Sequence, residues 1–349
     1  MKRTLTFILA AAAALSLVFS FGCSASDDNA SAHHPADGNL EIHFIDVGQA
    51  DATLIICDGE AMLIDGGNVG DSDLIYAYLK QENLPHLKYM VGTHAHEDHM
   101  GGLAGALNYA DVNTFFCSVT EDDSKFFNNV KSQLSKQGKE ITVPKVGSSY
   151  TLGDATFQFV GPIKESKETN NMSLVLRLEY GDTSFLFTGD AEAAEEADIL
   201  DAGYDISATV LKVGHHGSSG SSTYHFLREV APEYAVISCE TGNKYGHPHD
   251  EALSRLRDAD VQLYRTDLQG TILCTSDGTN VTFTTAKNPE IETNPTTGNS
   301  DGAYIGNVNS QVFHRPDCKS LPAEQNRTYF GSRMEAVDAG YTPCGRCKP

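Results

Sequence analysis

The sequence predicts a mixed α/β domain followed by a small, metal-stabilised C-terminal module. Between residues 40 and 286, apolar runs of strand length alternate with stretches of helical spacing, a pattern typical of α/β folds. Residues 287–302 are rich in Asn, Pro, Thr and Gly, which indicates a linker. Residues 303–349 are too few for a core of their own and carry three cysteines, so we expect a disulfide or a bound metal to stabilise this segment. Hydrophobic residues make up 40% of the 349 residues, enough for a packed interior.

The first 22 residues are expected to be a targeting signal rather than part of the fold. Lys2 and Arg3 precede an apolar run over 5–21, which is the pattern of a secretory signal. Residues 20–23, Ser-Phe-Gly-Cys, resemble a bacterial lipobox except for the bulky Phe, which predicts cleavage before Cys23 and lipid on its thiol. A transmembrane anchor is the alternative, because the run is nearly long enough to span a bilayer. In either case residues 23–39 would tether an exported domain, either at the cell surface or secreted.

The charge balance argues against strong non-specific binding to polyanions. The chain has 25 basic and 47 acidic residues, a formal charge of −22. No basic surplus is present to neutralise phosphates or an anionic membrane surface. A nucleic-acid substrate stays open, because bound divalent metals can supply local positive charge.

Strands are predicted where short apolar runs end at turn residues, at 40–45, 52–57, 60–64, 89–92, 114–117, 156–160, 173–178, 184–187, 208–213, 234–238, 261–264, 272–274 and 281–284. Helices are predicted from apolar residues at helical spacing, at 71–81, 103–109, 124–137, 191–202, 223–230 and 251–259. Two Asp-Gly pairs, at 58–59 and 277–278, predict hairpin turns.

The most informative segment follows the strand at 89–92 and reads Thr-His-Ala-His-Glu-Asp-His-Met-Gly-Gly. A loop at a strand end can direct such side chains into one cleft, and imidazole with carboxylate suits divalent metals. One metal could take His94 and His96, and a second Asp98 and His99. The alternative, a polar loop with coincidental histidines, does not account for three histidines and an aspartate within six residues.

Further candidate ligands follow later strands. Asp190 ends a predicted strand, where one carboxylate can bridge two metals. His215 and His216 follow the next predicted strand, and His247 and His249 follow the one after that. An aspartate after a strand is often a plain turn residue, and we expect one histidine of each pair to be an ordinary hydrogen-bonding group.

Together these motifs resemble the metallo-β-lactamase superfamily, and most closely the hydrolase domain of ComEC-type competence proteins. The resemblance is carried by His-x-His-x-Asp-His at 94–99, Thr-Gly-Asp at 188–190 and His-His-Gly-Ser at 215–218. Residues 44–52 and 63–67 also match, with Ala50 where that group has glycine. The resemblance covers residues 40–286 and implies an αββα sandwich with two divalent metals, zinc or manganese, at one edge.

The resemblance implies metal ligands at five positions, His94, His96, Asp98, His99 and Asp190. His215, His216 or His247 would complete the second metal, and another of these histidines would protonate the leaving oxygen; the choice stays open. Asp46 and Asp51 would lie near the site, and Asp65 would orient a ligand histidine.

One departure from the wider superfamily is the lack of any histidine between His99 and His215, where lactamases supply a ligand. Asn170 or Asn171 stands there instead, which predicts a more open first metal site and weakens the case for β-lactam hydrolysis. It also leaves zinc and manganese as alternatives.

The predicted activity is hydrolysis of a phosphodiester, as in a nuclease, by a hydroxide that two metals activate. A Gly-x-Ser-x-Gly elbow for a serine nucleophile does not occur in the sequence. The alternatives are hydrolysis of a surface phosphoester of the phosphorylcholine type, of a lactone or of a thioester. A non-enzymatic binding protein is a further alternative, against which the intact set of candidate ligands speaks.

The C-terminal module is predicted to hold one structural zinc through His314, Cys318, Cys344 and Cys347. A disulfide is the alternative, which an oxidising exterior would favour. The segment resembles the metal-binding domain of the Ada repair protein, with His314 where that family has a cysteine, so a stabilising or binding role replaces methyl-phosphate scavenging. Its basic residues could contact nucleic acid or form a solvated face: Arg315, Lys319, Arg327, Arg333, Arg346 and Lys348. Four other cysteines are expected to be buried thiols: Cys57, Cys117, Cys239 and Cys274.

Overall fold

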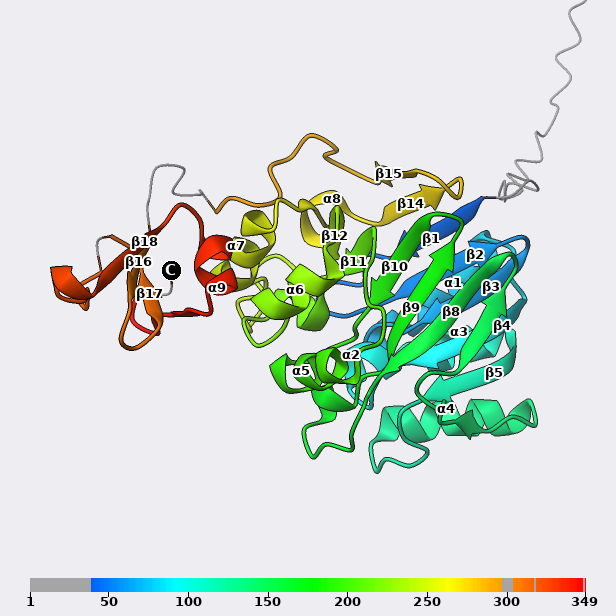
Figure 1. Cartoon of the computed structure of the whole chain (residues 1–349). Helices are drawn as coiled ribbons and strands as arrows, with labels where there is room; N and C mark the ends of the chain where they lie inside the picture. The colour runs from blue at the N-terminus through cyan, green and yellow to red at the C-terminus, as the bar shows by residue number, and fades with distance from the viewer. Residues whose placement is uncertain (1–38, 297–303, 317, 348) are drawn as a thin grey trace, which may run out of the picture.

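The computed structural model describes residues 39–296, 304–316, 318–347 and 349. The predicted signal, nearly all of the predicted tether and part of the predicted linker lie outside the described residues. Two large β-sheets stack face to face with helices on both outer sides, and a small third sheet forms the C-terminal module (Figure 1). Across the described part of the chain, no helix is long and apolar enough to cross a membrane.

The first sheet has eight strands, which are in spatial order β15 (Val281–Thr285), β14 (Ile272–Ser276), β1 (Leu40–Phe44), β2 (Thr53–Cys57), β3 (Glu60–Ile64), β4 (His86–Gly92), β5 (Asp111–Cys117) and β6 (Ile141–Thr142). Strands β1 to β3 form an antiparallel meander, whereas β3 to β6 run parallel. The predicted Asp58-Gly59 turn joins β2 to β3, and both residues have positive φ (50° and 78°).

The second sheet has seven strands, which are in spatial order β13 (Gln262–Arg265), β12 (Tyr234–Ile237), β11 (Val210–Lys212), β10 (Thr183–Phe187), β9 (Val175–Tyr180), β8 (Ala155–Gly161) and β7 (Ser149–Leu152). Strands β10 to β13 run parallel, and β7 to β10 are antiparallel. β6 and β7 are not predicted from the sequence, because each is short and only partly apolar.

Helices cover the outer face of each sheet. The first sheet is covered by α1 (Ser72–Gln81), α3 (Leu103–Tyr109) and α4 (Lys125–Lys136). The second is covered by α5 (Ala193–Ala202), α6 (Tyr224–Val230) and α7 (Asp250–Asp258). Shorter helical turns are η1 (Val69–Asp71), α2 (Glu97–Met100), η2 (Thr169–Met172), η3 (Gly214–Gly217) and α8 (Thr266–Gln269).

Strand β2 shows how the layers are bound together. Leu54 and Ile56 pack with the helices on one side of the first sheet, and Ile55 packs with the second sheet on the other. All three side chains are buried, and burying each contributes roughly 1.5–3 kcal/mol. The predicted αββα sandwich is confirmed.

The C-terminal module consists of β16 (Tyr304–Asn307), β17 (Val312–His314), β18 (Arg327–Phe330), β19 (Thr342–Pro343), η4 (Glu324–Asn326) and α9 (Arg333–Asp338). Its small apolar core includes Tyr224, which belongs to α6 of the large domain. Figure 1 shows α9 beside α6 and α7. The module therefore packs against the large domain and shares a core with it.

Candidate metal centre

The predicted histidine cluster begins where β4 leaves the first sheet. Asp65 follows β3 and holds the start of this loop, because its carboxylate accepts hydrogen bonds from Thr93 N (2.8 Å) and Thr93 Oγ1 (2.9 Å). The same carboxylate contacts His99 Nδ1 at 2.8 Å. Asp65 thereby fixes the ring orientation of His99, the orienting role expected for it.

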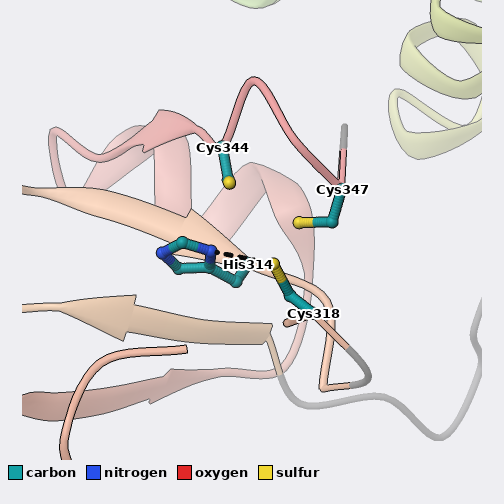
Figure 2. Close-up of side chains that lie close together, drawn as sticks. All are labelled: His314, Cys318, Cys344 and Cys347. Atoms are coloured by element: carbon teal, nitrogen blue, oxygen red, sulfur yellow. Dashed lines mark hydrogen bonds between the residues drawn. The ribbon is translucent and has the colours of Figure 1, made fainter. Parts of the chain in front are cut away.

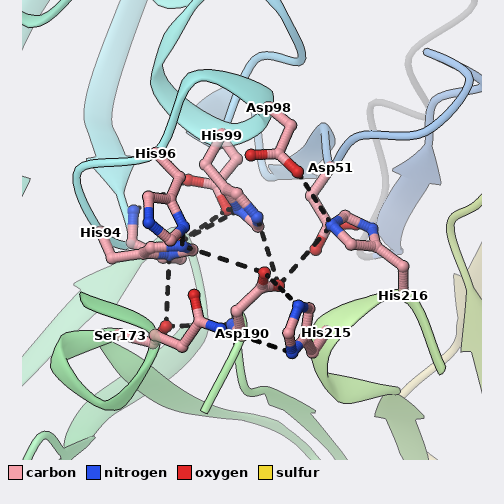
Figure 3. A network of polar contacts seen from close by, with 12 residues as sticks. Asp51, His94, His96, Asp98, His99, Ser173, Asp190, His215 and His216 are labelled. Atoms are coloured by element: carbon pink, nitrogen blue, oxygen red, sulfur yellow. Dashed lines mark hydrogen bonds and ion pairs between the residues drawn. The ribbon is translucent and has the colours of Figure 1, made fainter. Parts of the chain in front are cut away.

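His94, His96 and Asp190 form the first group of candidate ligands (Figure 3). His94 Nε2 lies 3.0 Å from His96 Nδ1 and 3.9 Å from Asp190 Oδ2. The other nitrogen of His94 contacts the hydroxyls of Thr93 (3.1 Å) and Ser173 (3.2 Å), which hold the ring. Two imidazoles and a carboxylate that converge in this way could hold one divalent cation.

Asp98, His99 and His216 form a second group of candidate ligands. His216 Nε2 lies 3.4 Å from Asp98 Oδ2, while its Nδ1 lies 3.0 Å from the carbonyl oxygen of Ser238. That carbonyl accepts a hydrogen bond from Nδ1–H, which leaves Nε2 available to a metal. The structure therefore places His216 beside Asp98 and His99, a choice that the sequence left open.

Asp190 stands between the two groups. Its Oδ2 faces His94, whereas its Oδ1 lies 3.2 Å from His99 Nε2 and 3.7 Å from His216 Nε2. Its backbone N–H donates to Ser173 Oγ (3.0 Å), which fixes the turn that presents the carboxylate. One carboxylate with an oxygen toward each group is the arrangement expected of a ligand that bridges two metals.

His215 and His216 share an uncommon backbone conformation inside η3. Both have φ in the left-handed region (51° and 53°), which costs roughly 1 kcal/mol or more for residues other than glycine. As a result both rings reach Asp190 from one turn, and His215 Nε2 lies 3.6 Å from Asp190 Oδ2. The His215 side chain is 22% exposed and also contacts Glu192 (3.2 Å), so it lies at the solvent-facing side of the centre.

Neighbouring opposite charges shift the pKa values of the buried groups in the centre against the effect of burial. Burial alone would lower the pKa of His216, but Asp190 and Asp51 raise it to about 10. Burial alone would raise the pKa of Asp98, but His216 and His99 lower it to about 2. An imidazole must be deprotonated to bind a metal, so cations bound here would displace protons from this cluster.

Buried polar atoms without a hydrogen-bond partner test whether metals fit. Among the described residues these atoms include His99 Nε2, Asp190 Oδ1, His216 Nε2 and Asp51 Oδ1. All four residues belong to the cluster in Figure 3. The contacts these atoms do make are ion pairs, such as His99 Nε2 with Asp190 Oδ1 at 3.2 Å, and bound cations would give them ligand bonds in place of the missing hydrogen bonds. The donor set fits divalent metals.

A buried ion pair beside the second group is not predicted from the sequence. Lys212 Nζ donates to Asp51 Oδ2 (2.9 Å) and to the carbonyl oxygen of Val213 (3.2 Å). Only 3% of the Lys212 side chain and 5% of the Asp51 side chain are exposed. Asp51 Oδ1 lies 3.4 Å from His216 Nδ1, so the pair adjoins the candidate ligands directly. The sequence feature that could have revealed this ion pair is the lysine at the end of an otherwise apolar strand.

His247 lies at the rim of the centre. Its Nδ1 is 3.4 Å from Gln49 Nε2, and its ring centroid is 5.3 Å from that of His215 and 6.3 Å from that of His216. Within the residues that the structure describes, His247 joins none of the groups that could hold a metal. Burial and the neighbouring His215 lower its pKa to about 4.

The remaining residues that the sequence singled out surround the centre. Asn170 Nδ2 donates to Glu192 Oε1 (3.0 Å), and Asn171 Oδ1 accepts from Glu192 N (3.1 Å), so both amides hold the segment after Asp190. Asp46 accepts a bond from Gly48 N (3.4 Å) in the loop that leads to Asp51.

The four predicted ligands of the C-terminal module converge in one cluster (Figure 2). The ligand atoms of His314, Cys318, Cys344 and Cys347 all lie within 4.8 Å of one another, and His314 Nδ1 is 3.4 Å from Cys318 Sγ. The three thiols are unpaired and converge with His314, which favours the metal site over the disulfide alternative. This donor set fits a tetrahedral zinc site. The other described cysteines are buried and free, as predicted: Cys57, Cys117, Cys239 and Cys274.

One basic residue of the module is not on the surface that the sequence suggested. Arg333 is 5% exposed, donates to Asp258 Oδ2 (2.9 Å) on α7 and lies over the ring of Tyr224 (5.4 Å). Arg333 therefore joins the module to the large domain. Lys348 lies outside the described residues, whereas three basic side chains surround a 240 Å³ pocket beside Cys318 and Cys347, namely Arg315, Lys319 and Arg346.

Comparison with known families agrees with both parts of the structure. The family model described as the Metallo-beta-lactamase superfamily matches residues 45–241, more than half of the chain. The chain belongs to the metallo-beta-lactamase superfamily. Membership of this superfamily supports a metal-dependent hydrolase with divalent metals, and the two ligand groups are candidates to hold them. A second model, the Metal binding domain of Ada, matches residues 296–349. Both resemblances predicted from the sequence are confirmed.

Curated relatives of this metallo-beta-lactamase superfamily member include two proteins of bacterial competence. It is 30% identical to ComE operon protein 3 of Bacillus subtilis over 256 residues, which cover 66% of this chain and 32% of that protein. It is 28% identical to Competence protein ComA of Neisseria gonorrhoeae over 230 residues, 65% of this chain and 31% of that protein. The chain thus spans about a third of the length of these relatives. A 52-residue segment, 14% of this chain, is 40% identical to Regulatory protein ada of Salmonella typhimurium and covers 15% of it.

Proposed function

We propose that this protein is an exported phosphodiesterase that cleaves nucleic acid, with DNA as its substrate. The observation that carries the proposal is Asp190, whose two carboxylate oxygens face two separate groups of candidate ligands. Two divalent metals, zinc or manganese, would supply an activated water and stabilise the charge that builds on a phosphoryl group. The similarity to competence proteins supports DNA as the substrate class.

The side chains of the centre have separate tasks under this proposal. His94 and His96 would hold the first metal, and Asp98, His99 and His216 the second, with Asp190 between them. Two of the ligand histidines are held in orientation through their Nδ1 atoms, His99 by Asp65 and His94 by Ser173.

The leaving oxygen needs a proton from a group that solvent can recharge. His215 is such a group, because it contacts Asp190 Oδ2 at 3.6 Å and its side chain is 22% exposed. We therefore propose His215 as the general acid of the site, a role the sequence left open between several histidines.

The proposal is tested with purified protein supplied with zinc or with manganese. We expect cleavage of linear DNA, plasmid DNA and bis-p-nitrophenyl phosphate, and a loss of at least about 100-fold in His96→Ala and Asp98→Ala, since each removes a ligand. His86→Ala is the matched control, because this exposed histidine starts the same strand, β4, far from the centre. Circular dichroism confirms that each variant is folded.

The substrates separate the proposal from its alternatives. Hydrolysis of the small diester without DNA cleavage would move the substrate to another phosphoester. Turnover of a lactone or thioester alone would contradict phosphodiester chemistry. Full activity of His96→Ala would contradict the two-metal arrangement itself.

Export is the second part of the proposal and rests on residues 1–23 of the sequence. Labelled fatty acid should be incorporated into the protein in cells and should be lost in Cys23→Ala. Recovery of the unlabelled, uncleaved chain from the cytoplasm would contradict export.

A further inference from the structure

An exposed tyrosine stands one ring away from the candidate ligands. Tyr245 is 52% exposed. Its ring lies nearly parallel to that of His247, with centroids 5.7 Å apart and planes at 25°. His247 is in turn nearly parallel to His216 of the second ligand group, at 6.3 Å and 23°. Three rings therefore lead from the metal centre to solvent.

The loop that carries Tyr245 is held in a fixed shape. Asn243 Oδ1 accepts hydrogen bonds from the backbone N–H groups of Tyr245 and His247, at 3.1 Å each. His249 Nδ1 accepts from Ser219 N (3.0 Å), so its Nε2–H donates to the carbonyl oxygen of Tyr245 (3.1 Å). A ring presented on such a loop loses little conformational entropy when it binds a ligand.

Exposure alone would mean little, since single exposed aromatic residues are common. Tyr76 (37%) and Tyr329 (59%) are also exposed, but they lie on α1 and in the C-terminal module. Tyr245 differs because it adjoins the metal centre and has a cation over its ring. Lys244 Nζ lies 4.8 Å from the ring centroid. An aromatic ring with an ammonium beside it is the combination by which proteins bind unpaired nucleotides.

We propose that Tyr245 and Lys244 form a subsite that stacks an unpaired nucleobase at the rim of the metal centre. The inference rests on the proposed function and narrows its substrate to single-stranded nucleic acid. A base stacks on an aromatic ring more strongly than an exposed ammonium does, so the base displaces Lys244 from the ring. The released ammonium then neutralises a neighbouring phosphate. Bases inside a duplex have both faces covered, and the subsite therefore discriminates against duplex.

Binding is tested by fluorescence. The chain has no tryptophan, so Tyr245→Trp introduces a single reporter at the subsite. In an Asp98→Ala background, which the proposed function makes inactive, a twelve-residue oligodeoxyadenylate should quench this emission. An abasic oligonucleotide of the same length and charge should not. Tyr76→Trp in the same background is the control and should respond equally to both. Equal quenching of the reporter at position 245 by both oligonucleotides would overturn the subsite.

Kinetics give a second, independent readout on the metal-loaded enzyme. Stacking is the same in the ground state and the transition state, so Tyr245→Ala should raise KM for the oligodeoxyadenylate about 5- to 50-fold with kcat unchanged. Tyr245→Phe should retain the wild-type KM. The abasic oligonucleotide should be cleaved equally by all three proteins, and the preference for single strand over duplex should vanish in Tyr245→Ala.

The two experiments separate failure of the subsite from failure of the proposed function. Base-dependent quenching without any DNA cleavage would keep the subsite and refute the nuclease. DNA cleavage with neither quenching nor a KM effect would keep the nuclease and refute the subsite.

Discussion

Replacing Lys212 by methionine should destabilise the protein strongly, even though the substitution conserves volume and lies behind the candidate ligands. Lys212 Nζ lies 2.9 Å from Asp51 Oδ2, and both side chains are almost fully buried. The ammonium and His216 lower the pKa of Asp51, against the effect of burial. Lys212→Met leaves that carboxylate buried beside Asp190 with no ammonium to balance it.

The size of the loss follows from the geometry. At 2.9 Å and an effective dielectric constant of 20, the Coulomb attraction is roughly 6 kcal/mol. Part of this is offset in the native protein by the cost of removing both charges from water. Removal of one partner alone typically costs about 3–5 kcal/mol, and we expect Lys212→Met to lower the free energy of unfolding by that amount at pH 7.

The assay is urea denaturation of chelator-treated protein, followed by circular dichroism. Lys131→Met is the matched control, because Lys131 pairs with Glu121 at the surface and should cost less than about 1 kcal/mol. The double variant Asp51→Asn with Lys212→Met should recover at least half of the loss, since no unpaired charge remains. A loss below about 1 kcal/mol in Lys212→Met, or no recovery in the double variant, would refute the reasoning.

Three further predictions concern other parts of the fold. Burial raises the pKa of Glu195 from 4.5 to about 7, so the folded state holds a proton that the unfolded state releases, and the stability of the protein falls as pH rises through this window. Glu195→Gln should therefore be about 1–2 kcal/mol more stable than wild type at pH 8 and equal to it at pH 4.5. Thermal unfolding at the two pH values measures this difference. Cys344→Ala should bind one metal fewer per chain than wild type by elemental analysis, since it removes a ligand of the module. Arg333→Met should speed hydrogen exchange in α6, because its buried pair with Asp258 docks the module, whereas Arg228→Ala, which breaks an exposed pair, should not.

Much of the fold was predictable because its signals are local. The helix predicted at 103–109 has the bounds of α3, since a glycine pair precedes it and apolar residues recur at helical spacing. The central strands are buried on both faces, and their near-continuous apolar runs identify them. Strand β7 reads Ser-Tyr-Thr-Leu and owes its existence to pairing with β8, a tertiary contact that its own four residues do not encode.

The candidate site, too, was predictable only where its signals are local in the sequence. The spacing of the motifs identified every residue of the two ligand groups, but it could not show which of His215, His216 and His247 lies among the ligands. Their ranking depends on the left-handed backbone at His215 and His216, which directs the two rings to opposite oxygens of Asp190. Lys212 was missed for a similar reason, because its partner Asp51 lies 161 residues away in the sequence, in the loop between β1 and β2 of the other sheet.

The acidity of the chain and a polyanionic substrate are reconciled at the centre itself. The four aspartates, Asp51, Asp65, Asp98 and Asp190, and the one ammonium of Lys212 give the cluster a formal charge of −3 when its imidazoles are neutral. Two divalent cations would offset this negative charge, so the centre would no longer repel a phosphate. Under the proposed function, affinity for nucleic acid would arise at the metals and at the rim loop with Lys244, while the net negative charge of the chain would disfavour binding elsewhere. The proposed function is therefore compatible with a formal charge of −22, because the metals would supply the positive charge that a DNA substrate needs.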